Sequence, residues 1–343
     1  MHVESDYCVN KPQLVFSDKN NFIELLIKYP KVKIKIPFIS QILKIKRYKY
    51  YYNYGLNFLK SKEFTPDLVH CNVMHPVGIV AKIWKKKFNI PYVITEHWTG
   101  FLPSDGRYAK SLILKLALPH IANSAEKILP VSSDLKKALK QNNLGKKFQI
   151  IHNVVNTQKF YPQNKIKNKF LVVADLENGQ KNIFGILNSF KVFCETNDEI
   201  TLNLVGGGND KALILEQIKQ LNLSKKVKLH GRLIPEEINN LLAESHAAIL
   251  FSNYENLPCV IVEAFSAGIP FISTNVGGVR EIINEERGVL IPAKDEMALV
   301  KAMNQVLETD WNHEGIINFA VNTFSYQKIG QEFDTIYKEV IGV

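Results

Sequence analysis

The feature that most constrains the fold of this chain is a segment in its second half where an apolar run, a polar turn and an apolar helix follow one another. Residues 247–252 form a short, mostly apolar run with the length of a buried strand, and the polar turn 253–256 follows directly. Pro258 suits the start of a helix, where its missing N–H would be unpaired anyway, and Gly268 ends that helix. A second apolar run at 271–274 completes the unit, and this succession predicts an α/β fold.

Two glutamates in this unit indicate a binding site. Glu255 lies in the turn and Glu263 lies inside the helix, with seven residues between them. The unpaired N–H groups of the helix start favour a phosphate group. Carboxylates beside such a site are explained if hydroxyl groups donate hydrogen bonds to them, and a sugar nucleotide carries both kinds of group. The alternative from the residues alone is a solvated turn glutamate and a helix-surface glutamate in a salt bridge.

The whole segment resembles the donor-binding signature of retaining glycosyltransferases of family 4, the glycosyl transferases group 1 domain. In that family two glutamates with seven residues between them precede a Gly-x-Pro helix end, a Gly-Gly turn and a further glutamate. Here the corresponding parts are Glu255, Glu263, Gly268-Ile269-Pro270, Gly277-Gly278 and Glu281. The resemblance implies the GT-B fold, an α/β architecture of two Rossmann-like domains with parallel sheets facing a cleft. It covers residues 65–340 well and the first 64 residues poorly.

The resemblance also implies how the chain divides into domains. We expect an acceptor-side domain at residues 1–162, a nucleotide-sugar-binding domain at 163–325, and a C-terminal helix at 326–343 that crosses back to the first domain. A polar stretch at 163–169 agrees with this boundary. Family members open with a strand, a glycine-rich loop and a long helix, and no such loop precedes Gly55. Either the chain is truncated at its start or its first domain is reduced.

Donor contacts follow from the resemblance, position by position. Lys181 would stabilise the leaving diphosphate, Glu255 would hold hexose hydroxyls, and Glu263 would accept hydrogen bonds from the ribose. Further donor-binding positions are Gly207, Arg232, Leu233, Tyr254, Asn256, Leu257, Pro258 and Val260. On the residues alone, Lys181 is equally a solvated loop lysine, and the glycines around Gly207 are equally a turn. Asp175 stands where the family usually carries an arginine, which removes one bidentate phosphate contact.

Histidines follow two strands of the first domain. The expected strand 90–95 ends in Glu96-His97-Trp98, and the carboxyl end of a parallel strand is where α/β sheets place ligands. By resemblance, His97 is a catalytic residue that positions the donor sugar or the acceptor. Taken alone, a histidine in this position is more often structural. His75 follows the preceding strand near the same cleft, and the loop 100–107 would line the acceptor side.

Several classes of cofactor are not expected. The sequence has no D-x-D motif, so a metal that bridges the diphosphate is not predicted, and Gly206-Gly207-Gly208 is not the fingerprint of a dinucleotide site. We therefore expect no metal and no cofactor besides the donor. The four cysteines are scattered, which favours free buried thiols. No signal peptide opens the chain, and no uncharged apolar stretch approaches the ~18 residues of a membrane span.

The charge is distributed unevenly along the chain. Residues 1–150 hold 25 lysines and arginines against 10 acidic residues, so this half is strongly basic although the whole chain carries only +10. Residues 37–60 form a predicted helix that mixes five tyrosines with lysines and aliphatic residues. Such a stretch can lie on an anionic membrane surface, or it can be an ordinary domain helix with a solvated basic face. Nucleic acid is not an expected partner, because no recognised nucleic-acid motif accompanies the basic stretch.

The predicted function is a retaining hexosyltransferase. It would move a sugar from a UDP- or GDP-linked donor to a hydroxyl of a glycan or lipid-linked glycan, in capsule, O-antigen, lipopolysaccharide or exopolysaccharide biosynthesis. The expected place is the cytoplasm, with peripheral attachment at the inner face of the plasma membrane as a further expectation. One alternative is a catalytically impaired sugar-nucleotide-binding or scaffold protein. A sugar-nucleotide epimerase would need additional acid–base carboxylates, and the pair Glu255 and Glu263 argues against it.

Overall fold

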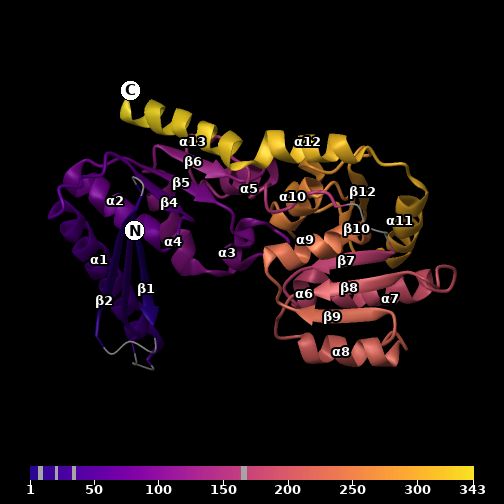
Figure 1. The fold of residues 1–343 in the computed structure, drawn as a ribbon. Coiled ribbons are helices and arrows are strands. Elements are labelled where there is room, and N and C mark those ends of the chain that lie inside the picture. Colours follow the sequence, from indigo (N-terminus) through magenta and orange to yellow (C-terminus); the bar gives the residue numbers. More distant parts are fainter. Residues whose placement is uncertain (7–10, 20–21, 33–35, 164–167) are drawn as a thin grey trace.

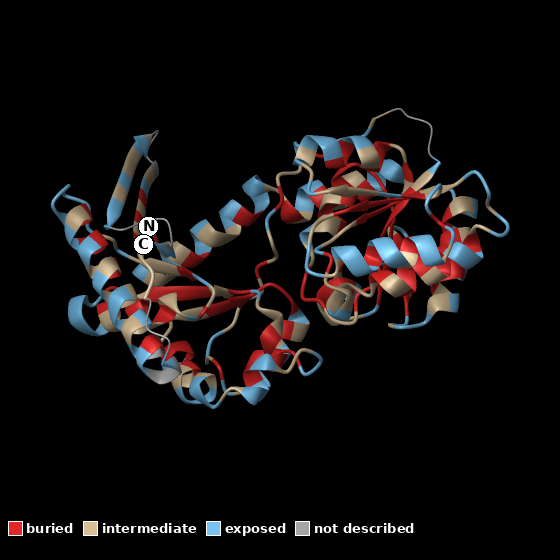
Figure 2. Ribbon diagram, turned by 90° about the horizontal axis from the view of Figure 1, so that it is seen from below, coloured by how far each residue is buried: buried red, intermediate tan, exposed pale blue. Residues whose placement is uncertain are grey.

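The computed structural model describes residues 1–6, 11–19, 22–32, 36–163 and 168–343. The polar stretch expected at 163–169 falls partly outside these described residues. Figure 1 shows two lobes joined by a long C-terminal helix that lies across the first of them. Figure 2 shows that buried residues concentrate on the sheets of the two lobes, while exposed residues line the outer faces of the helices. The expected arrangement of two α/β domains is confirmed.

The second domain is built on a six-stranded sheet with the order β12-β11-β10-β7-β8-β9. Every neighbouring pair in it runs parallel. The strands are β7 (Lys169–Val173), β8 (Thr201–Val205), β9 (Val227–Gly231), β10 (Ser245–Leu250), β11 (Phe271–Thr274) and β12 (Gly288–Ile291). The four inner strands are mainly buried, as expected of a parallel sheet covered on both faces, whereas the edge strands β9 and β12 are partly exposed.

Helices connect these parallel strands. They are α6 (Asn178–Lys181), α7 (Ile183–Phe193), α8 (Lys211–Gln220), α9 (Pro235–Ala243), α10 (Cys259–Ser266), η2 (Gly277–Glu281) and α11 (Glu296–Glu308). The predicted strand–turn–helix–strand unit is β10, α10 and β11, and it is confirmed. Helix α9 ends at Ala243, and the fully buried Ser245 already belongs to β10.

The order of strands reverses beside β7. The chain continues from β7 to β8 and β9 on one side of it, and then returns to place β10 on its other side. In open parallel sheets the loops at such a reversal leave a crevice at the carboxyl edge, which is where ligands bind. The loops that follow β7 and β10 therefore define the natural binding position of this domain.

The strands of the first domain divide into two sheets of three. β4 (Val69–Asn72), β5 (Tyr92–Glu96) and β6 (Lys127–Pro130) form a parallel sheet. The other sheet has the order β1-β3-β2, with β1 (His2–Asp6), β2 (Gln13–Lys19) and β3 (Phe22–Pro30). In it β1 pairs with β3 in parallel, whereas β2 and β3 pair antiparallel. The first domain therefore differs from one continuous parallel sheet, because a hairpin cannot supply parallel neighbours.

The helices of the first domain are α1 (Pro37–Lys60), α2 (Val77–Phe88), η1 (Thr99–Phe101), α3 (Arg107–Lys110), α4 (Leu112–Ala122) and α5 (Ser133–Gln141). The helix predicted at 37–60 is confirmed by α1. Its second half buries Tyr52, Leu56 and Leu59 against the β1–β3 sheet and Trp84. Its first half leaves Ile39 and Ile42 exposed. Packing within the domain thus explains the apolar residues in the second half of α1 but not those in its first half.

The chain ends with α12 (His313–Phe324) and α13 (Tyr326–Ile341). Helix α13 covers one face of the β4–β6 sheet, with Ile329 and Ile336 packed against strand residues (Figure 1). His70 on β4 lies 2.6 Å from the hydroxyl of Tyr337 and 2.6 Å from the hydroxyl of Thr95. Burial lowers the pKa of His70 to about 4, so this residue is neutral and structural.

Among the described helices, none is long and apolar enough to cross a membrane. The expectation of free cysteines is met at Cys71, Cys194 and Cys259, but that of buried thiols is wrong in part. Cys71 is buried, Cys194 is half-buried and Cys259 is exposed on the first turn of α10. Cys8 lies outside the described residues.

Candidate active site

An ion pair occupies the point where the strand order reverses. Lys181 ends the short helix after β7, and Glu255 lies in the turn after β10. The Lys181 Nζ and the Glu255 Oε1 are 2.5 Å apart, and the two side chains are only 15% and 7% exposed. A buried pair of this kind is costly to break on one side only, because the remaining charge is left without a partner. Both residues were predicted to act on the donor, and the fold brings them into contact.

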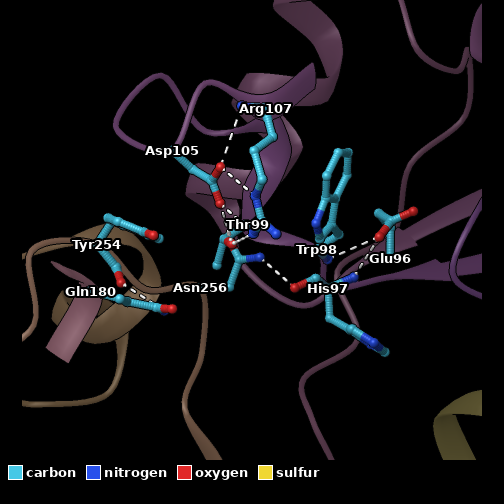
Figure 3. Close-up of polar contacts among 9 residues, drawn as sticks. All are labelled: Glu96, His97, Trp98, Thr99, Asp105, Arg107, Gln180, Tyr254 and Asn256. Atoms are coloured by element: carbon cyan, nitrogen blue, oxygen red, sulfur yellow. Dashed lines mark hydrogen bonds and ion pairs between the residues drawn. The ribbon is translucent and has the colours of Figure 1, made fainter. Parts of the chain in front are cut away.

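Three hydrogen bonds to backbone carbonyls hold the two loops of this pair together. The Asn253 N–H donates to the Gln180 carbonyl at 2.8 Å, and the Asn253 side-chain amide donates to the Gly179 carbonyl at 3.0 Å. The Gln180 side-chain amide donates to the Tyr254 carbonyl at 3.3 Å (Figure 3). Lys181 and Glu255 are therefore held by their neighbours as well as by each other.

Asn256 links this turn to the first domain. Its side-chain amide donates to the His97 carbonyl at 2.6 Å, and its carbonyl accepts from the Gly278 N–H at 2.9 Å (Figure 3). Its side-chain oxygen is buried and has no hydrogen-bond partner in the described part of the chain. The predicted donor turn and the predicted catalytic histidine thus meet across the cleft through one hydrogen bond.

Glu263 lies on α10, the helix that follows the turn of Glu255. Its carboxylate is half-buried, and burial raises its pKa above the usual range. No hydrogen bond or ion pair to the Glu263 carboxylate is formed within the described residues. A desolvated carboxylate without a partner is unfavourable by itself, so this position favours a ligand that donates hydrogen bonds.

Glu96 shapes the first-domain wall of the cleft. It ends β5, is 1% exposed, and accepts hydrogen bonds from the N–H groups of Met74, His97 and Trp98 at 2.9, 3.0 and 2.9 Å. Burial raises the pKa of Glu96 to about 7, although the three N–H groups oppose that shift. Glu96 was not among the predicted site residues. The signal for one was an acidic residue that closes an apolar strand.

His97 itself presents its ring to the cleft. The residue is exposed, and Figure 3 shows its ring directed away from Asp105 and Arg107. Partial burial lowers the pKa of His97, as it also does for His75 on the neighbouring loop. Both rings are therefore held toward the neutral form. His75 and His97 line the same cavity, as expected from their positions after adjacent strands.

The loop expected to line the acceptor side is held by a rigid cluster. Arg107 donates from Nε and Nη2 to the two oxygens of Asp105 at 2.7 and 2.6 Å, and from Nη2 to the Thr99 hydroxyl at 3.0 Å. The guanidinium carbon lies 5.3 Å from the ring centre of Trp98. Tyr254 of the second domain faces this cluster: its pKa is raised by burial and, further, by the negative charge of Asp105 (Figure 3).

The glycine-rich loop after β8 has two different roles. A Cβ at Gly206 would lie 1.8 Å from the Ala174 carbonyl oxygen, and one at Gly208 would lie 2.5 Å from the Leu176 carbonyl oxygen. Those two glycines therefore permit a close approach of the loop after β7. Only Gly207 faces a side chain, with 3.2 Å from such a Cβ to the Nε of Arg232.

Arg232 forms an ion pair with the residue that replaces the arginine of the family. Its Nη2 lies 3.3 Å from the Asp175 Oδ1, and both side chains are largely exposed. An exposed pair contributes little to stability. The guanidinium missing from the loop after β7 is thus matched by one that follows β9, at the same edge of the sheet.

The remaining predicted donor positions lie on the same edge. Leu257 is buried, and its carbonyl accepts from the side-chain amide of Asn153 at 2.6 Å. Pro258 precedes the first turn of α10, while Val260 lies in that turn and is half-buried. Leu233 follows β9 and packs against the core. For all four, contact with a donor stays a prediction.

The signature residue Glu281 serves the domain interface. Its carboxylate accepts from the Ser133 N–H at 2.8 and 2.9 Å and from the Asp134 N–H at 3.3 Å, at the start of α5. Arg280 forms an ion pair with Asp134. A Cβ at Gly278 would lie 2.5 Å from the Cβ of Ser132, so the glycine permits this contact. No sequence pattern indicates this contact, because the partners are 148 residues apart.

The described residues contain no cluster of three side chains that could hold a metal ion. One edge of the second domain thus carries Lys181, the carboxylates of Glu255 and Glu263 and the start of α10, while His75 and His97 line the cavity of the first domain.

Comparisons with protein families give two adjoining matches. The family model described as "Glycosyl transferases group 1" matches residues 155–321, and "Glycosyltransferase Family 4" matches residues 25–159. The second match begins within β3, so the resemblance extends further toward the start of the chain than the sequence motifs indicated. Among curated proteins, the chain is 24% identical over 288 residues to TuaC of Bacillus subtilis, a candidate teichuronic acid biosynthesis glycosyltransferase. That alignment covers 81% of this chain and 70% of TuaC.

Solved structures show the same fold. The sucrose-phosphate synthase of Thermosynechococcus elongatus superposes with a TM-score of 0.78 at 18% identity, covering 99% of this chain and 88% of that protein. The Anabaena protein HepE, solved with UDP and glucose, gives a TM-score of 0.73 at 17% identity, covering 92% of this chain and 86% of HepE. The two-domain arrangement with its cleft is thus the GT-B fold.

Proposed function

We propose that this chain, which belongs to the family 4 glycosyltransferases, moves a sugar from a nucleotide-sugar donor to a hydroxyl acceptor with retention at the anomeric carbon. One observation carries the proposal. The pair Lys181–Glu255 lies at the reversal of the strand order, and α10, the helix that follows the turn of Glu255, carries Glu263, whose carboxylate has no partner among the described residues. A cation for a diphosphate and a carboxylate for hydroxyls are the two groups that a sugar nucleotide needs.

The donor would lie along the carboxyl edge of the second domain. Lys181 and the N–H groups at the start of α10 would bind the diphosphate, and Arg232 would add a second cation beside Gly207. Glu255 would accept hydrogen bonds from the hexose and Glu263 from the ribose. The solved complex of HepE with UDP and glucose supports a UDP-linked donor, and a GDP-linked donor is the alternative. Contacts from Leu233, Tyr254, Asn256, Leu257, Pro258 and Val260 complete the proposed site.

The reaction exchanges one bond at the anomeric carbon for another on the same face. The bond to the leaving diphosphate oxygen breaks, the bond to the acceptor oxygen forms, and the acceptor proton passes to the leaving oxygen. Negative charge grows on the diphosphate as the bond breaks, so the fixed charge of Lys181 lowers the barrier. His97 would position the donor sugar and the acceptor. We assign no enzymatic nucleophile, and the proposal requires no metal or other cofactor.

The two domains would divide this work. Residues 1–162 would bind the acceptor, residues 163–325 the donor, and the helix at 326–343 would tie the second domain to the first. We propose a glycan acceptor in cell-surface polysaccharide biosynthesis, which the similarity to TuaC supports. The proposed place is the cytoplasm, at the inner face of the plasma membrane.

A catalytically impaired sugar-nucleotide-binding protein is the second candidate. Asp175 favours it, since a negative charge stands where the family usually carries an arginine. In the structure, however, Arg232 pairs with Asp175 and returns a guanidinium to the same edge. This candidate predicts donor binding without turnover.

The test is the release of nucleoside diphosphate from a panel of UDP-, GDP- and ADP-linked sugars. We expect slow hydrolysis of one donor, faster release with a glycan acceptor, and a product whose anomeric configuration by NMR matches that of the donor. An inverted product would contradict retention. Binding without release from any donor and acceptor would favour the impaired protein.

A further inference from the structure

A large cavity opens in the first domain, directly behind His97. Its volume is about 1430 Å³, and α1, α4 and the loops after β4 and β5 line it. Typical small-molecule sites measure about 300–1,000 Å³, so this cavity exceeds what one sugar residue needs. It is separate from the donor edge, because every lining residue belongs to the first domain.

The two ends of the cavity differ in chemistry. At the inner end, His75, His97 and Thr99 give it polar walls beside the cleft. Away from them the walls are mainly apolar and come from α1, α2, α4 and the sheet β1–β3. These apolar lining residues include Tyr29, Ile45, Tyr48, Ile79, Leu114 and Leu118. A ligand that fits has a hydroxyl-bearing head and an apolar body.

Exposed apolar side chains mark the outer rim. On α4, Leu112, Ile113 and Leu116 are 71%, 68% and 65% exposed, and on α1 Ile39 and Ile42 are 43% and 40% exposed. Ile113 and Ile42 belong both to this rim and to the cavity lining. Single exposed apolar residues are ordinary, but a group of them around the mouth of an apolar cavity indicates a docking surface.

The surroundings of the rim are basic. Lys44 and Lys49 of α1 line the cavity, and Lys46 and Arg47 lie beside them on the same helix. Neither α1 nor α4 contains an acidic residue, and Lys115 of α4 is exposed between the rim leucines. No ion pair to Lys44, Lys46, Lys49 or Lys115 is formed within the part of the chain that the structure describes. This surface therefore complements a negative charge.

We propose that the acceptor is a lipid carrying a phosphate, with its apolar chain in this cavity, and that the rim of α1 and α4 docks on an anionic leaflet to receive it. The inference rests on the proposed function and names the acceptor class of the same reaction. Rim side chains enter the interface as those of a basic amphipathic surface do. The lysines bind the phosphate and neighbouring anionic headgroups, and the hydroxyl end of the acceptor reaches His97.

Binding of the apolar chain is tested by titrating the protein with farnesyl phosphate and, as a control, with inorganic phosphate. Trp98 lines the cavity, whereas Trp84 and Trp311 are buried elsewhere, so its emission reports on occupancy. We expect the titration of tryptophan fluorescence to give a dissociation constant for farnesyl phosphate at least tenfold lower than that for inorganic phosphate. The change should disappear in Trp98→Phe. Equal affinity for the two probes, or a change that persists in Trp98→Phe, overturns the cavity assignment.

Docking of the rim is tested by flotation with phosphatidylglycerol vesicles and with phosphatidylcholine vesicles. We expect flotation only with the anionic vesicles, weakened by salt. The variant Leu112→Ser with Leu116→Ser should bind the anionic vesicles at least about tenfold more weakly. The reason is that two apolar side chains that would be buried in the membrane interface are removed. A matched control, Leu213→Ser with Leu215→Ser on α8, changes residues that are 58% and 41% exposed in the second domain and should float like the wild type. Equal flotation of the two variants overturns the docking surface.

The same preparations separate this inference from the proposed function. Release of nucleoside diphosphate in the absence of lipid reports on the donor site alone. Donor hydrolysis without vesicle binding would overturn the lipid acceptor and leave the glycosyltransferase standing. Vesicle binding without any donor binding would instead overturn the proposed function.

Discussion

The two walls of the cleft are built in opposite ways. On the second-domain wall, charged and polar groups hold one another in place. Examples are the ion pair Lys181–Glu255 and the hydrogen bonds from Asn253 to the loop after β7. On the first-domain wall, the buried carboxyl of Glu96 orders the loops after β4 and β5, and behind them lies a wide, mainly apolar cavity. Lys44 and Lys49 line this cavity and form no ion pair within the described residues.

This difference indicates how each wall would achieve its specificity for a substrate. The diphosphate and the sugar hydroxyls of the proposed donor require fixed charges and carboxylates at set positions, so the donor wall uses a short, ordered motif. The acceptor wall is shaped by packing between helices and by a divided sheet, which allows it to vary. Four predictions, from the largest expected effect to the smallest, test this contrast between a fixed donor wall and an adaptable acceptor wall.

The largest effect is expected at the fixed cation. Lys181→Met should lower the rate of nucleoside diphosphate release about 10²- to 10³-fold, because the charge that stabilises the leaving group is lost. Binding to anionic vesicles should not change. The control is Lys191→Met, an exposed lysine on α7. If Lys181→Met keeps more than a third of the wild-type rate, Lys181 does not stabilise the leaving group, and the donor wall does not depend on this fixed charge.

The second effect concerns the buried carboxyl of the acceptor wall. The pKa of Glu96 is about 7 in the folded protein against 4.5 as the ordinary value, so the folded state holds a proton that the unfolded state releases. This contribution to stability is full below pH 4.5 and is lost as the pH rises to 7, by about 3 kcal/mol in total.

Glu96→Gln removes the titrating group. The difference in unfolding free energy between wild type and Glu96→Gln, measured by urea denaturation at several pH values, should therefore change across this interval and stay constant above it. A difference independent of pH would show that Glu96 is ionised throughout, and that the acceptor wall is as fixed by charge as the donor wall.

The third effect is at the contact that joins the walls. Glu281→Gln should destabilise the protein by about 1–2 kcal/mol, because the first-turn N–H groups of α5 lose an anionic acceptor. Glu285→Gln, at an exposed position four residues on, should change stability by less than about 0.5 kcal/mol. Urea denaturation measures both. If the two variants behave alike, Glu281 does not bind the domains together in solution.

The smallest effect is expected at the exposed pair of Asp175 and Arg232. Asp175→Asn should leave stability within about 0.5 kcal/mol. It should raise affinity for a nucleotide sugar modestly, by less than tenfold, since it removes a negative charge beside the diphosphate position. Calorimetry measures the affinity, and Asp198→Asn, another exposed aspartate of the second domain, is the control. A loss of affinity in Asp175→Asn would mean that Asp175 itself contacts the donor.

The sequence predicted the donor wall better than the acceptor wall for a physical reason. The spacing of Glu255, Glu263 and the glycine turns is local, so one helix and one turn place them. The helix 37–60 was also predictable, from its length and composition. The bond between Asn256 and the His97 carbonyl, and the contact of Glu281 with α5, join residues about 150 positions apart. Tertiary packing alone brings those together, as it does the walls of the cavity.

The central claim is that the donor binds at the carboxyl edge of the second domain independently of the acceptor wall. Calorimetric titration of a panel of nucleotide sugars tests it most directly, on the wild type, on Glu263→Gln and on Leu112→Ser with Leu116→Ser. The account predicts binding of one donor, weakened about ten- to hundredfold by Glu263→Gln and unchanged in the variant of α4. Equal binding to wild type and Glu263→Gln, or no binding of any donor, would contradict it.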